Sequence, residues 1–373
     1  MIIYIFTILL LFTFSLLEEN IALSFSIRRM MYIIVYLLLV IQMGLRWETG
    51  TDWYPYLRHF ESINEYSRNS IPQNQFEYGY NLLVWITKLI FSNYSFFLLV
   101  HAIIYYLLIF KSFKRYTPYL FLSLLMFYTL SMGMMGSNRQ LIAVAIGLYA
   151  IRYIIEKKPV LFFLLILIAI SFHTTAFLFI IYYFLDREIN LNSLILILGC
   201  SFIIFVFASP QISLNLFSFI GKFIGGTADS KTSFYLGNAK DVHSEYSLST
   251  IGLIKRLVFL SFFYYNRKII SNKLPYYNIM LNGYIIGLVF YFLFAHSLLV
   301  MVSRGSLYFN MMEPLLISSQ MILLKRNENK VALIFMLFIF SIFFFFQSIT
   351  TYQDLFVPYK GIFINTGFHR AMY

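Results

Sequence analysis

Long apolar runs separated by short polar segments follow one another along most of the chain. A helix needs about 20 residues to cross roughly 30 Å of hydrocarbon, and most of these runs approach that length. The runs are Ile2–Leu17, Met30–Leu45, Tyr94–Phe110, Tyr116–Met134, Arg139–Ile155, Leu191–Ala208, Ile251–Tyr265, Tyr277–Val302, Ser306–Leu324 and Val331–Phe346. The pattern predicts an all-α, polytopic integral membrane protein with about ten transmembrane helices.

Two further apolar segments do not fit a simple crossing. Asn81–Phe91 is too short to span and indicates an interfacial or re-entrant position, while Val160–Leu185 is interrupted by His173 and its polar neighbours. Basic clusters orient the chain, because lysine and arginine accumulate in loops that stay on the cytoplasmic side. The clusters are Arg28/Arg29, Lys111/Lys114/Arg115, Arg152/Lys157/Lys158, Arg267/Lys268/Lys273 and Lys325/Arg326/Lys330. All fall on one side only if Val160–Leu185 enters and leaves by the same face, as a re-entrant hairpin or two short spans with His173 at the turn.

The same orientation places both termini and two long polar loops outside. These loops are Arg46–Tyr80 and Ser209–Thr250, and we expect residues 1–373 to form a single transmembrane domain around them. Composition agrees, since 60% of residues are hydrophobic and 12% charged, against about 45–50% and 25% in soluble proteins. This balance excludes a soluble enzyme, a disordered protein and a fibrous protein. The net charge of +12 is explained by the cytoplasmic loops, so no nucleic-acid partner is predicted.

Ionisable residues gather at the predicted outer ends of the spans. In GLRWETGTDWYPY (Gly44–Tyr56), Arg46 and Asp52 stand on either side of a glycine turn. A belt of interfacial aromatic anchors explains the tryptophans of this stretch, but it explains the charged pair less well. In QFEYGYN, Glu77 precedes a short apolar segment, where capping of a helix start is the routine explanation.

Three more stretches carry candidate chemistry. MGMMGSNRQL places Arg139 and Gln140 on the first turn of a helix that Ser137 or Asn138 is expected to cap, and a helix N-terminus beside an arginine suits a phosphate.

His173 lies inside an apolar segment, where an ionisable group is a functional candidate by default. In VSRGSLYFNMMEPLL, Arg304 and Tyr308 are four residues apart and share a helical face, and Pro314 predicts a kink.

Several familiar signatures are missing from the sequence. It contains no P-loop, no glycine-rich dinucleotide turn and no nucleophile elbow of the G-x-S-x-G type. Its histidines and its one cysteine do not show metal-ligand spacing. No cofactor and no metal are therefore predicted.

Taken together and in this order, the stretches resemble the EpsG/Wzy family of bacterial polysaccharide polymerases. The resemblance rests on GLRWETGTD with Tyr56 nearby, FEYGYN, Arg139–Gln140, Phe172–His173 and SRGSLYF, and VPYKGIF near the C-terminus continues it. It implies a GT-C-like membrane glycosyltransferase of the bacterial inner membrane, with its active site facing the exterior. Its substrate would be an oligosaccharide linked to polyprenyl (undecaprenyl) diphosphate, and its product an O-antigen, capsule or exopolysaccharide. A chain-length regulator and a flippase are the implied protein partners.

Transfer from a lipid diphosphate assigns roles to these residues. Arginine binds phosphate in a bidentate manner, so Arg46, Arg139 and Arg304, with Gln140, are predicted to bind the diphosphate. The acceptor hydroxyl needs a base, for which Asp52 is the first candidate and Glu77 the second. His173 suits either role. Tyr56 and Tyr308 are predicted to contact the substrate.

Two other classes of function stay open. A flippase for lipid-linked oligosaccharide would usually show internal repeats and charges near the middle of the membrane, and neither is evident here. A membrane O-acyltransferase acting on glycans could use His173, but its supporting motifs are missing. The sequence favours the polymerase.

Overall fold

The computed structural model describes residues 1–19, 23–63, 76–207, 215, 218–219, 250–294 and 305–370. Within these ranges the regular structure is helical, without a β-strand, and isolated bridges join Arg46 to Gly361 and Gly361 to Ile364. The all-α architecture predicted from the apolar runs is confirmed. Contacts along the chain define two compact units, Met1–Phe177 with Ile317–Tyr373, and Leu178–Leu316.

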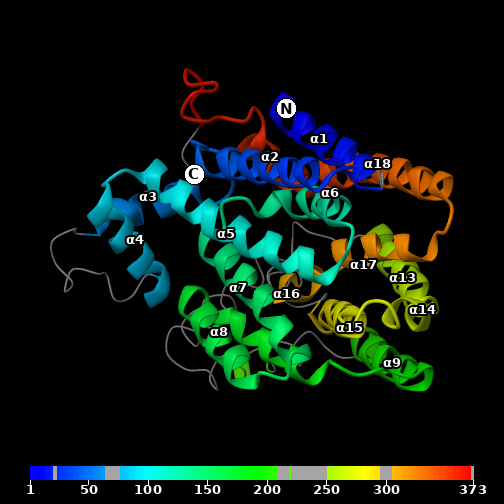
Figure 1. Ribbon diagram of the computed structural model, residues 1–373. Coiled ribbons are helices and arrows are strands. Elements are labelled where there is room, and N and C mark those ends of the chain that lie inside the picture. Colours follow the sequence, from blue (N-terminus) through cyan, green and yellow to red (C-terminus); the bar gives the residue numbers. More distant parts are fainter. Residues whose placement is uncertain are drawn as a thin grey trace. The chain divides into compact units, whose positions relative to one another are not determined.

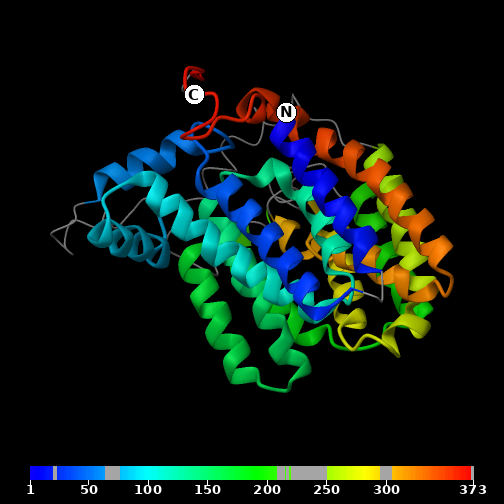
Figure 2. The same cartoon turned by 45° about the horizontal axis from the view of Figure 1, so that its top comes forward.

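The first unit contains the N-terminal helices and the C-terminal end of the chain. Its elements are α1 (Ile2–Glu18), α2 (Phe25–Gly44), α3 (Trp53–Ser62), α4 (Tyr78–Ile90), α5 (Tyr94–Tyr116), α6 (Leu120–Ser131), η2 (Met132–Met134), α7 (Asn138–Ile155), α8 (Pro159–Phe172), η5 (Gln320–Leu323), α18 (Asn327–Ile349), η6 (Thr350–Tyr352) and α19 (Gln353–Phe356). In Figure 1, α1, α6 and α18 lie side by side, and α2 packs along α5. Figure 2 shows α7 and α8 as two green helices joined by a short turn.

Polar side chains begin several of these helices. The side chains of Ser24 and Asn93 accept hydrogen bonds from backbone N–H groups in the first turns of α2 and α5. The start of α6 is capped by a distant residue, since the carboxylate of Glu18 accepts from the N–H groups of Leu120 (2.9 Å) and Phe121 (3.1 Å). An acid at a helix N-terminus satisfies backbone donors that have no partner inside the helix. The end of α1 is thereby fixed to the start of α6.

The second unit contains α9 (Leu191–Phe207), α13 (Thr250–Tyr265), α14 (Arg267–Ser271), α15 (Tyr277–Phe294) and α16 (Leu307–Asn310). The segments η3 (Thr174–Phe184) and α17 (Glu313–Ser319) cross the boundary in sequence between the units. Inside this unit Lys255 forms an ion pair with Glu313 (Nζ to Oε1, 3.0 Å). The side chain of Asn282 donates to the backbone oxygens of Leu185 and Arg187, both at 2.7 Å.

Four described helices are long and apolar enough to cross a membrane, namely α2, α5, α15 and α18, and α1, α6, α8, η3 and α9 are shorter apolar helices. Several predicted spans coincide closely with helices. Leu191–Ala208 corresponds to α9, Arg139–Ile155 to α7 and Ile2–Leu17 to α1. The multi-pass character is therefore supported, and the number of crossings stays a prediction.

One predicted span is wrong as a single helix and another begins too early, and proline explains both. Ser306–Leu324 is divided into α16, α17 and η5. Proline disfavours a helix interior and suits a first turn, and Pro314 is the second residue of α17. The span predicted as Tyr116–Met134 begins at Leu120 instead. Pro118 disfavours the helical conformation in the residue before it, so α5 ends at Tyr116 and α6 begins after the proline.

The interruption predicted at His173 is confirmed. Helix α8 ends at Phe172, His173 adopts an extended backbone, and the chain continues as the 3₁₀ helix η3. The face to which Val160–Leu185 returns stays a prediction, as do the outward positions of the loops Arg46–Tyr80 and Ser209–Thr250. Almost all of Ser209–Thr250 and the middle of Arg46–Tyr80 lie outside the described residues.

Candidate functional site

Two glycine turns bring the loop after α2 against the loop before α7. Gly50 and Gly136 both have positive φ angles, +98° and +117°, which glycine adopts without strain. A Cβ at Gly50 would collide with the carbonyl of Met135, and one at Gly136 would collide with the backbone of Thr51. The N–H of Thr51 donates to the oxygen of Met135 (2.9 Å). The tight turn predicted at Gly50 is thus confirmed, and its purpose is close approach to the segment that begins α7.

Arg139 lies on the first turn of α7, as predicted. Its Nη1 donates to Oε2 of Glu77 at 2.5 Å, and its Nε donates to the Tyr56 hydroxyl at 3.2 Å. The guanidinium stands over the ring of Phe76, 4.0 Å from its centroid. The side chain is 15% exposed. Arg139 therefore joins three segments that are far apart in sequence.

Glu77 occupies the N-cap position of α4, but its side chain does not cap the helix. A side-chain cap is not formed, because both carboxylate oxygens are used elsewhere; the acid at the helix start keeps the interaction with the helix dipole that the sequence suggests. Oε2 accepts from Arg139, and Oε1 accepts from the backbone N–H (3.3 Å) and the hydroxyl (3.2 Å) of Thr174. The carboxylate thus connects α4, α7 and the beginning of η3.

Arg46 contacts the same turn of α7 through Asn138, the residue before Arg139. Its Nη2 donates to Oδ1 of Asn138 at 2.6 Å, and its Nη1 donates to the carbonyl of Met43 at 2.7 Å. His101 bonds to the Asn138 carbonyl through Nε2 (2.8 Å). Arg46 is 1% exposed, and within the described chain no acid forms an ion pair with it. The expected side-chain cap by Ser137 or Asn138 is wrong, since α7 has none and Asn138 binds Arg46 instead.

Asp52 begins α3 in a left-handed backbone conformation (φ +54°) and is partly exposed. Its carbonyl accepts from the N–H of Tyr56, whose hydroxyl binds Arg139. Burial raises the pKa of the Tyr56 phenol, although the charge of Arg139 acts in the opposite direction. The phenol therefore stays protonated at neutral pH. Asp52 and Arg139 are linked through this one tyrosine.

The remaining predicted residues are more widely placed. His173 is partly exposed, and its Nδ1 lies 2.7 Å from the hydroxyl of Thr175, directly beside the threonine that binds Glu77. Gln140 is buried on α7. Tyr308 is buried in the second unit, where its carbonyl accepts from Tyr182 (3.0 Å). Arg304 lies outside the described residues.

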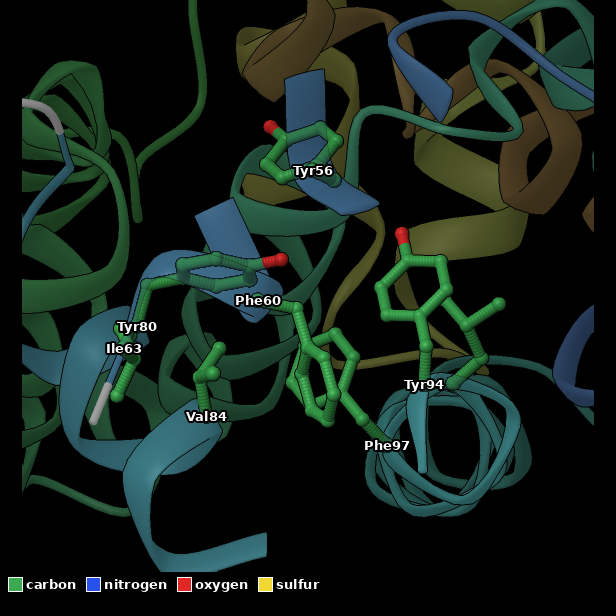
Figure 3. Packing of buried hydrophobic residues seen from close by; sticks show 8 residues of the cluster. Tyr56, Phe60, Ile63, Tyr80, Val84, Tyr94 and Phe97 are labelled. Carbon is green, nitrogen blue, oxygen red and sulfur yellow. The ribbon is translucent and has the colours of Figure 1, made fainter. Parts of the chain in front are cut away.

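An aromatic cluster packs around Tyr56, the tyrosine that binds Arg139. It consists of Tyr56, Phe60, Ile63, Tyr80, Val84, Tyr94, Phe97 and Leu98, with Trp47, Trp53 and Phe76 among the residues packed against it. Figure 3 shows the rings of Tyr56, Tyr80 and Tyr94 within this cluster. Packed aromatic side chains occupy defined positions, so Tyr56 and Phe76 present fixed surfaces to Arg139.

The C-terminal segment contacts the Arg46–Asp52 loop through residues to which sequence analysis assigned no role. Lys360, 3% exposed, donates from Nζ to Glu48 (2.9 Å). The backbone N–H of Arg370 donates to Glu48 (3.1 Å), and its Nη1 donates to the carbonyl of the same residue (2.5 Å). Burial raises the pKa of Glu48, but the bonds from Lys360 and Arg370 outweigh it and hold the pKa below its usual value. The one available signal was VPYKGIF, which contains Lys360.

The described residues contain no group of three or more His, Cys, Asp or Glu side chains placed to hold a metal ion. The charged groups of the site are instead two arginines and two acids within the first unit. Such a set can bind an anionic group at Arg139 and accept a proton at a carboxylate.

A model of the EpsG family, the family of Wzy-like polysaccharide polymerases, matches residues 29–361 of the chain. The matched region includes every residue predicted for the site, from Arg46 to Tyr308. Searches of the curated proteins and of the solved structures each found no match.

Proposed function

The chain belongs to the EpsG family, and we propose that it extends a bacterial surface polysaccharide by glycosyl transfer from a polyprenyl diphosphate. Family membership indicates a polymerase of polysaccharides in a multi-pass membrane protein. The donor is the growing glycan on its lipid diphosphate, and the acceptor is the next lipid-linked repeat unit. The product is an O-antigen, capsule or exopolysaccharide chain.

The observation that carries the proposal is the position of Arg139, which pairs with Glu77 and is linked to Asp52 through Tyr56. Arg139 is partly exposed, lies on the first turn of α7 and contacts Glu77 and Tyr56. A helix N-terminus with an arginine favours an anion such as a diphosphate. Asp52 is partly exposed and is connected to Arg139 through Tyr56, so we assign its carboxylate as the base.

The proposed reaction uses both Arg139 and Asp52. The bond from the anomeric carbon to the diphosphate oxygen breaks, and the lipid diphosphate leaves with the electron pair. Arg139 stabilises the charge that develops on that leaving group. The acceptor hydroxyl oxygen forms the new bond to the anomeric carbon, and Asp52 takes its proton.

We also propose that this site faces the exterior, at the outer surface of the inner membrane. The proposal rests on the basic clusters in the opposite loops. Single cysteines at Glu61 and at Lys157, both exposed, introduced into a Cys200→Ala background, test it. Labelling of Glu61→Cys from outside and of Lys157→Cys only after permeabilisation is expected, and the reverse pattern contradicts the proposed orientation.

Deletion of the gene followed by glycan analysis tests the function. A strain without a polymerase should display single repeat units on their carrier and regain long chains when the wild-type protein is supplied. A strain without a flippase should display no repeat units outside. Unaltered chain length in the deletion strain contradicts the proposal.

A further inference from the structure

We propose that the Glu77 carboxylate is a stand-in for the substrate phosphate. It pairs with Arg139 until the donor diphosphate displaces it. The inference rests on the proposed function and concerns the same site. It gives Glu77 the role of a positioning residue that sets donor affinity, in place of a second base. Four features of the site support the exchange.

Arg139 is held in place without Glu77. Its Nε donates to the Tyr56 hydroxyl (3.2 Å), and its guanidinium lies on the Phe76 ring (4.0 Å). The preceding residue, Asn138, is anchored by Arg46 and His101. The planar guanidinium of Arg139 therefore keeps its orientation when the Glu77 carboxylate leaves, and it can bind an incoming phosphate in a bidentate manner.

Glu77 keeps favourable surroundings after leaving Arg139. Its other oxygen accepts from the backbone N–H and the hydroxyl of Thr174. It also stands at the N-terminus of α4, a helix of 13 residues, where the helix dipole stabilises a negative charge. The exchange therefore does not strand an unpaired carboxylate.

The pair is placed where an exchange is energetically accessible. The side chains of Arg139 and Glu77 are 15% and 8% exposed, so the pair lies at the edge of the packed region. Because both charges are largely removed from water, the cost of desolvation offsets much of their mutual attraction, and the net stability of the pair is limited. A diphosphate carries more negative charge than one carboxylate, and its attraction to the same guanidinium is correspondingly larger.

The arrangement also explains why an acid is needed before the donor arrives. An arginine that is mostly removed from water is costly when no anion compensates its charge. Glu77 supplies that anion in the free enzyme. The consequence is a measurable competition, in which Glu77 lowers donor affinity.

Binding of geranylgeranyl diphosphate to the purified full-length protein in detergent tests this competition. Glu77→Gln removes the competing charge and is expected to tighten binding about 3- to 10-fold. The matched control is Glu156→Gln, which removes an acid paired with Arg115 and Lys158 away from the site and should leave the affinity unchanged. Equal or weaker binding by Glu77→Gln contradicts the inference.

A second variant keeps the test decisive where Glu77→Gln does not fold. Thr174→Val removes a hydrogen bond that holds Glu77 away from exclusive pairing with Arg139, so binding should weaken about 2- to 3-fold. Unchanged or tighter binding overturns the inference. Arg139→Gln separates the two proposals: if it binds the diphosphate as wild type does, the proposed diphosphate site itself fails, whatever Glu77 does.

Discussion

Arg46 contacts the first turn of α7 and Arg139 is part of that turn, and the surroundings of the two arginines differ. Arg46 is 1% exposed and donates to a backbone carbonyl and to the amide of Asn138. Arg139 is 15% exposed and pairs with the carboxylate of Glu77. The same residue type thus appears once as a buried charge with neutral acceptors and once as a partly exposed charge paired with an acid.

The difference assigns the two arginines to different tasks. A buried cation without an acid is expensive, and it is retained only where its hydrogen bonds fix a geometry or serve a function. Arg46 fixes Asn138, and with it the position of the next residue, Arg139. In the proposed reaction, the partly exposed Arg139 is the arginine that binds the donor phosphate. We therefore expect substitutions near Arg139 to affect turnover and those at Arg46 to affect stability.

Asp52→Asn should have the largest effect, because it removes the proposed base beside Tyr56 and Arg139. Asparagine keeps the size and hydrogen bonding of the side chain but accepts no proton. Loss of a general base typically costs about 10²- to 10⁴-fold in rate. The length of the glycan ladder at matched protein abundance measures the effect.

Glu77→Gln belongs beside this variant as its comparison. A full ladder from Asp52→Asn would remove Asp52 from the catalytic role. Loss of the ladder in Glu77→Gln alone would move the base to Glu77 and argue against the stand-in role.

Arg139→Lys should reduce polymer formation about 10- to 100-fold while protein abundance stays near normal. Lysine keeps the charge but loses the planar fork, and one charge-assisted hydrogen bond is worth about 1.5–3 kcal/mol. Arg115→Lys is the matched control, because Arg115 is 54% exposed and pairs with Glu156. Wild-type ladders from Arg139→Lys would show that Arg139 acts as a point charge only.

Arg46→Met should lower stability and leave donor affinity nearly intact. The substitution leaves the Met43 carbonyl and the Asn138 amide without their donor, and a buried group without a partner costs about 1–3 kcal/mol. Thermal unfolding in detergent and binding of geranylgeranyl diphosphate measure the two effects separately. Loss of binding at unchanged stability would instead support Arg46 as the diphosphate ligand predicted from the sequence.

Only part of the contrast between Arg46 and Arg139 could be predicted from the sequence. Apolar length, proline and glycine act locally, so the helix containing Arg139, the turn at Gly50 and the break at His173 could be predicted. The hydrogen-bond partners of the two arginines could not be predicted. Glu77 and Arg139 are 62 residues apart, and Arg46 and Asn138 are 92 apart. No local rule selects one acid or amide from the many available at such distances.

The wrong capping prediction at Asn138 and the missing side-chain cap at Glu77 show why local rules fail at this place. Asn138 and Glu77 both stand at helix starts, where their residue types commonly cap. In the folded chain, the Asn138 side chain accepts a hydrogen bond from Arg46, and the Glu77 side chain accepts one from Arg139. Polar residues at a helix start are therefore ambiguous whenever a cation from another segment can reach them.

The smallest expected effect concerns Glu48, which joins the C-terminal segment to the loop that carries Arg46. Its pKa is lower in the folded protein than its usual value near 4.5, through bonds from Lys360 and Arg370. The stability it contributes is therefore present above pH 4.5 and is lost as the pH falls through the folded pKa. The site is partly exposed, so we expect the thermal midpoint of wild type to fall by only about 1–2 °C more than that of Glu48→Gln between pH 6 and pH 4. Glu156→Gln serves as control, since Lys158 likewise lowers the pKa of Glu156, but its ion-pair partners Lys158 and Arg115 lie outside the C-terminal segment. An equal fall in Glu48→Gln and wild type would mean that other contacts, such as the backbone pairing of Trp47 with Lys360 and the Thr49 hydroxyl bond to Lys360, hold the C-terminal segment beside Arg46.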